Sequence, residues 1–234
     1  MKITNTLLAG VLALSACSSF AQQSDLSISI TNLTQSIYFT PLLVATHDKQ
    51  TKLFEVGMSA SAELQAMAEG GDISGLSAMA QGAGARVTEN PASGILAPSM
   101  STSVSMDSGN MDYLSITAML LPTNDGFVGL SAWMIPEQPG TYTIMLNGYD
   151  AGTEANNELL VADGGIPGML GMPGIPGGMG GTGGTGVTVT EANTRVHIHR
   201  GNLGDADING GVSDVNSSIH RWLNPVAKVV VTVH

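Results

Sequence analysis

Two acidic turns, each next to a strand-like run, contain candidate metal ligands. Asp125 lies in the turn from Thr123 to Leu130, and Asp150 and Glu154 lie in the turn from Tyr149 to Asn157. Calcium takes about 6–8 oxygen ligands, and carboxylates on glycine-containing turns at strand ends supply them. If both turns meet at one rim, the three carboxylates would repel one another without a cation. The alternative is that these Asp and Asn side chains only form turn hydrogen bonds.

A second acidic loop starts with Asp205, Asp207 and Asn209 and matches the opening half of an EF-hand loop. The twelfth position is Asn216, where an EF-hand requires a bidentate Glu. Two interpretations stay open, a second calcium site or an ordinary loop rich in Asp and Asn.

A soft-metal site is the main alternative to calcium. His197 and His199 alternate on a strand-like run, so both would point to one face. Together with Met169, Met172 or Met179 as soft ligands they could bind copper or zinc. The alternative function would then be that of a periplasmic copper- or zinc-binding protein.

Catalysis and nucleic-acid binding find no support in the sequence. The chain has no Gly-x-Ser-x-Gly elbow, no His-Glu-x-x-His pair and no phosphate-cradling loop. Its formal charge of −11, with only 8 Lys and Arg, lacks the basic footprint of a nucleic-acid binder. An acidic surface attracts divalent cations and basic partners instead. We therefore predict a non-enzymatic protein.

The first residues predict export. Met1-Lys2 precedes an apolar run from Leu7 to Ala16 that is too short to span a bilayer. Residues 1–21 would be a signal peptide, or residues 1–16 a lipoprotein signal that leaves Cys17 as an acylated N-terminus attached to the outer membrane. Cys17 is the only cysteine. The mature chain would therefore contain no disulfide. With either signal, we expect the mature chain in the periplasm, anchored to the outer membrane or outside the cell.

Short alternating segments predict an all-β, antiparallel β-sandwich in one domain, residues 26–234. The expected strands cover residues 26–31, 37–46, 53–57, 104–106, 113–121, 127–133, 141–146, 187–189, 195–199 and 227–233. A short helix is expected over 59–68, with a further turn over 74–79. The Gly- and Met-rich stretch 164–186 is expected to be a flexible loop inserted between strands.

Several motifs occur in the order typical of a spondin N-terminal domain. They are Tyr38 to His47, Leu53 to Gly57, Met119 to Gly129, Asp150 to Glu154 and Leu223 to Ala227. The chain resembles a bacterial, exported, stand-alone member of that family over about residues 26–234. The turn that contains Asp150 is the most specific element of the resemblance.

The resemblance implies a C2-like antiparallel β-sandwich, with a calcium ion bound by loops at one end. Asp125, Asp150 and Glu154 match the acidic positions of the family motif, although Glu154 replaces an Asp and reaches one methylene further. The resemblance also implies a non-catalytic adhesion or recognition role. The partner would be an unidentified protein or glycan at the cell surface.

Overall fold

The computed structural model describes residues 25–174, 180–188, 190 and 192–234, so the predicted signal segments, Cys17 and Met179 lie outside the described residues. The prediction of an all-β, antiparallel fold with short helices is confirmed. The strands are β1 (Asp25–Asn32), β2 (Tyr38–Phe39), β3 (Leu43–His47), β4 (Arg86–Glu89), β5 (Ser101–Asp107), β6 (Tyr113–Leu121), β7 (Gly126–Met134), β8 (Gly140–Asp150), β9 (His197–Ile198) and β10 (Ala227–Val233), and the helices are α1 (Ala62–Gly70) and α2 (Ser74–Gly82).

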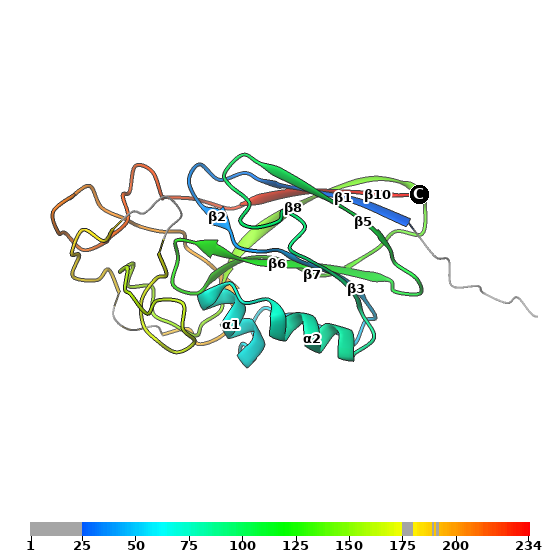
Figure 1. Ribbon diagram of the computed structural model, residues 1–234, viewed down its shortest axis with the longest axis horizontal. Helices are drawn as coiled ribbons and strands as arrows, with labels where there is room; N and C mark the ends of the chain where they lie inside the picture. The colour runs from blue at the N-terminus through cyan, green and yellow to red at the C-terminus, as the bar shows by residue number, and fades with distance from the viewer. Residues whose placement is uncertain (1–24, 175–179, 189, 191) are drawn as a thin grey trace, which may run out of the picture.

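Eight of these strands form one hydrogen-bonded path in the order β4-β3-β6-β7-β8-β10-β1-β5, and β2 and β9 pair beside it with β6 and β8. Strand β8 belongs to two layers, because residues 140–146 pair with β10 and residues 147–150 pair with β7. The two edge strands of the path meet through an ion pair between Arg86 and Asp107, with 2.6 Å between Nη1 and Oδ2. The path is therefore nearly closed (Figure 1).

The core has two parts, one on each face of the β3-β6-β7 layer. Between the layers lie the inward residues of β1 and β10, such as Ile28 and Val231, whose alternate burial reflects the period of two along a strand. On the other face the helices contribute residues such as Met67 and Leu76. Strand β6 is covered on both faces, which explains the almost continuous apolar run over residues 113–121.

Helix α1 lies three residues later at its start and two residues later at its end than the predicted range 59–68. The Ser61 hydroxyl accepts a hydrogen bond from the Leu64 amide at 3.1 Å, and Gly71 ends the helix in the left-handed conformation with φ 74°. The expected turn at 74–79 is a full helix, α2. Across the described part of the chain we find no helix with the length and apolar character that a bilayer crossing requires.

Several sequence predictions are wrong in detail. Residues 53–57 form no strand; instead the Phe54 ring packs against Phe127 with 4.9 Å between ring centroids. The expected strand 37–46 is divided at Pro41 into β2 and β3. Residues 187 and 188 are not in a strand, and residue 189 lies outside the described residues. Strand β4 was not predicted, since it is short and three of its four residues are polar.

Most of the chain between β8 and β10 forms loops at one end of the sheet. Figure 1 shows these loops on the left, opposite the start of β1 and the last residue, His234. Buried carboxylates hold the loops together. Asp214 Oδ1 accepts hydrogen bonds from the amides of Thr182, Gly183 and Gly184. The described part of the predicted flexible stretch therefore makes specific contacts with the rest of the domain.

Candidate cation site

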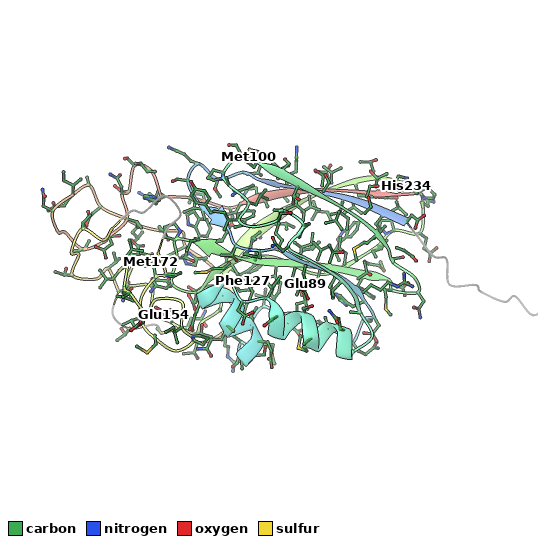
Figure 2. The ribbon with its side chains drawn as sticks, in the orientation of Figure 1. Glu89, Met100, Phe127, Glu154, Met172 and His234 are labelled. Carbon is green, nitrogen blue, oxygen red and sulfur yellow. The ribbon has the colours of Figure 1, made fainter. Side chains whose placement is uncertain are left out.

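The structure brings Asp125, Asp150 and Glu154 to the same end of the sheet. Asp125 ends the β6–β7 turn and Asp150 is the last residue of β8, where it pairs with Gly126. The Ala151 amide donates to the Asp125 carbonyl at 3.2 Å, and the following turn returns Glu154 to the same place. The three residues are 0%, 1% and 7% exposed. Figure 2 shows Glu154 at the loop end of the molecule.

The Asp125 carboxylate has one oxygen with hydrogen-bond donors and one without. Oδ2 accepts from the Thr153 amide at 2.9 Å, the Thr153 hydroxyl at 3.3 Å and the Glu154 amide at 3.2 Å. Oδ1 is buried and has no hydrogen-bond partner among the described residues. A buried acceptor without a donor is costly, so this oxygen indicates a missing ligand or proton.

The Glu154 carboxylate repeats this asymmetry. Oε1 accepts from the Asn124 side-chain amide at 2.7 Å and from the Gly171 amide. Oε2 is buried and unpartnered within the described chain. Two neighbouring turns therefore each place one unpartnered carboxylate oxygen in the interior.

The Asp150 carboxylate is held at both oxygens. Oδ1 accepts from the Gly152 amide at 2.8 Å, and Oδ2 accepts from the Asn156 side chain at 2.7 Å. Gly152 allows this tight return because it adopts φ 71°, a conformation open to glycine. His197 Nδ1 lies 3.7 Å from Asp150 Oδ1.

Burial and mutual repulsion make the ionised carboxylates unfavourable. Burial raises the pKa of Asp125 to about 8, and the carboxylates of Asp150 and Glu154 add to this effect. Burial also raises the pKa of Glu154 to about 7, with a further contribution from the carboxylate of Glu69. Both residues would hold a proton more tightly than in water, and a bound cation would have the opposite effect on their pKa values.

The carboxylates cannot complete a metal coordination shell by themselves. Among the described residues, no group of three or more His, Cys, Asp or Glu side chains lies close enough together to hold a metal ion. A calcium ion here would also need amide or backbone carbonyl oxygens, which are ordinary calcium ligands. The described carboxylate and amide oxygens therefore suit a hard cation.

Sequence reasoning missed three neighbours of these carboxylates. Asn124 and Asn156 stand in the acidic turns themselves, so their position next to Asp125 and Asp150 was the available signal. Gly171 lies 17 residues after Glu154 in the Gly-rich stretch. No local pattern marks it as a partner.

The second acidic loop uses its carboxylate to hold its own backbone. Asp205 accepts hydrogen bonds from the amides of Asp207, Val212 and Ser213 at 2.7–2.9 Å. These hydrogen bonds lower the pKa of Asp205, and the one from the Ser213 amide has the largest effect. The geometry matches the alternative interpretation of an ordinary loop rich in Asp and Asn.

Among the described residues of the predicted copper or zinc site, His197, His199 and Met172 have different surroundings. His197 faces Asp150, whereas His199 is buried and its ring centroid lies 5.0 Å from that of Trp222. The Nδ1 atom of His199 accepts a hydrogen bond from the Gly201 amide. Met172 is fully buried in a separate cluster with Val215.

The family model described as Spondin_N matches residues 31–159, more than half of the chain. The matched range includes Asp125, Asp150 and Glu154. The comparison with curated proteins returns no match.

Proposed function

The chain belongs to the Spondin_N family, and from this premise we propose that it is an exported, non-catalytic domain that binds calcium and recognises a partner. The family indicates an extracellular domain without enzymatic activity. Our proposal adds a calcium ion at the ends of β6, β7 and β8. It also adds a recognition or adhesion role for the loops around that ion, toward a protein or glycan at the cell surface.

One observation carries the calcium proposal: Asp125 Oδ1 and Glu154 Oε2 are both buried without a hydrogen-bond partner in the described chain. In a folded protein such atoms usually have a donor, an ordered water or an ion next to them. A divalent cation would satisfy both oxygens at once. It would also offset the burial, and after it the repulsion from Asp150, that raise the pKa of Asp125.

Each carboxylate would have its own role in this site. Asp125 and Glu154 would bind the ion through their unpartnered oxygens, since their other oxygens hold the turns in place. Asp150 would contribute negative charge. Calcium would supply positive charge that fixes the two turns relative to each other.

The placement of the loops supports a recognition role. The loop end lies opposite the start of β1 (Figure 1). If Cys17 carries a lipid, the eight residues from there to Asp25 span at most about 28 Å. The loop end would then point away from the membrane that holds the lipid. The cation site would organise the surface most accessible to a partner.

Calcium-dependent unfolding tests the proposal. At a free concentration one hundred times the dissociation constant, calcium should stabilise the protein by about 3 kcal/mol. Asp125→Asn and Glu154→Gln should each remove this gain, because each removes one charge from a proposed ligand. Asp163→Asn is the matched control, since Asp163 is an exposed carboxylate in the same loops. An equal gain in all three variants would show that calcium binds elsewhere or without specificity.

A further inference from the structure

Two buried carboxylates hold the loop of residues 161–172, which includes the start of the Gly- and Met-rich stretch 164–186. Glu154 Oε1 accepts a hydrogen bond from the Gly171 amide. Glu69, a fully buried residue of α1, accepts from the Gly168 amide through Oε2 at 2.6 Å. The loop is therefore attached to the candidate cation site on one side and to a helix on the other.

The base of this loop is closed by backbone hydrogen bonds. The Met172 amide donates to the Leu159 carbonyl at 2.7 Å, and the Val161 amide donates to the Met172 carbonyl at 3.2 Å. Met172 is fully buried beneath them and is labelled in Figure 2 near Glu154. Gly165 also lies against Gly70 at the end of α1, and the two carboxylates hold the loop at Gly168 and Gly171.

The loop displays large aliphatic side chains to solvent. Val161, Ile166, Met169 and Leu170 are between 38% and 52% exposed. Exposed apolar side chains that lie close together often mark a surface with a binding role. Whatever fixes this loop also fixes the position of an apolar surface.

We propose that Glu154 couples the cation site to the apolar loop, so that calcium binding fixes the loop in the position seen here. This inference rests on the proposed function. One oxygen of Glu154 binds the loop, and the other is the unpartnered oxygen offered to the cation. A cation at Oε2 orients the carboxylate, which keeps Oε1 in place for the Gly171 amide. By reciprocity, a loop held on Glu154 raises the affinity for the cation.

Amide hydrogen exchange tests the coupling directly. Exchange at Gly168 and Gly171 should slow when calcium replaces a chelator. At a free calcium concentration of one hundred times the dissociation constant, the exchange rate should fall by at most about 100-fold. This limit is reached if opening of the loop abolishes calcium binding. Calorimetry on the same samples measures calcium binding itself. If calcium binds and exchange does not change, the coupling is overturned and the proposed function stands; if calcium does not bind, both fail.

The reciprocal experiment alters the loop from outside the cation site. Glu69→Ala removes the acceptor for the Gly168 amide, whereas Glu69→Gln removes the same charge and keeps an acceptor. We expect calcium affinity to be at least about fivefold weaker in Glu69→Ala than in Glu69→Gln. Gln65→Ala, which removes the other hydrogen-bond partner of Glu69, should leave the affinity unchanged. Equal calcium affinities in the two Glu69 variants would overturn the coupling. If Glu69→Ala does not fold, hydrogen exchange on the unaltered protein decides whether the loop and the cation site are coupled.

Discussion

Replacing Asp125 by Asn should have opposite effects on stability with and without calcium. Without a cation, the folded chain buries a carboxylate whose pKa is raised from 3.8 to about 8 by burial first and by the nearby Asp150 second. Asn has nearly the same shape and no charge. Its side-chain oxygen can still accept from the amides of Thr153 and Glu154, as Oδ2 of Asp125 does.

The expected magnitude follows from the pKa of Asp125. A pKa difference of one corresponds to about 1.4 kcal/mol, so ionised Asp125 lowers the free energy of unfolding by about 5 kcal/mol at pH 8. Asn removes this cost and leaves one buried amide group without an acceptor, which costs about 1–3 kcal/mol. The variant should therefore be more stable than the unaltered protein by about 3 kcal/mol at pH 8 in chelator.

The pH dependence has a definite sign. Because the pKa of Asp125 is higher in the folded chain than in the unfolded chain, the folded chain binds the proton more tightly. Without calcium, the contribution of Asp125 to stability is therefore greatest below about pH 4 and falls as the pH rises toward about 8. At pH 4 the carboxyl is protonated in the folded chain and about 40% protonated in the unfolded chain, so little of the ionisation cost remains and the advantage of Asn disappears.

Urea unfolding at pH 4 and pH 8, in chelator and in calcium, measures all four conditions. In calcium at pH 8 the unaltered protein should recover about 3 kcal/mol at one hundred times the dissociation constant, and the variant should recover nothing. The reasoning would be refuted if Asp125→Asn in chelator destabilised the protein equally at both pH values. That result would mean that Asp125 is not ionised at a cost in the folded chain.

Two further predictions concern the packing that supports the site. Gly148→Ala should destabilise the protein by about 1–3 kcal/mol, because the added methyl group would lie 2.6 Å from the ring of Trp222. An unchanged midpoint in urea unfolding would mean that the Trp222 ring moves aside freely. Met172→Ala should lower the free energy of unfolding by about 2–5 kcal/mol, because Met172 is fully buried against Val215 and Leu160 beneath the loop. A loss below about 1 kcal/mol in the same assay would show that this cluster adds little to stability.

Local patterns predicted the regular elements well. The alternation from Leu26 to Thr31 predicts β1 because every second side chain of that strand is buried. Ser61 before α1 and Gly71 after it mark where the helix begins and ends, since capping depends on neighbouring residues only. These signals act over a few residues, so the sequence displays them directly.

Segments whose structure depends on distant contacts were predicted less well. The strand predicted around Phe54 is absent because its ring fills space beside Phe127 and Tyr149, a contact that a sequence pattern does not display. Strand β4 forms because it pairs with β3, although three of its own four residues are polar. In both cases tertiary packing outweighs the local preference.

The candidate site shows the same division. The sequence by itself determined which side chains could bind a hard cation, because Asp125, Asp150 and Glu154 stand on turns next to apolar strands. Only the tertiary structure decided which carboxylate oxygens lack a donor, and that Gly171 holds one oxygen of Glu154. The physical reason is that residue chemistry belongs to the chain, whereas burial and hydrogen-bond partners depend on neighbours that folding brings together from distant positions.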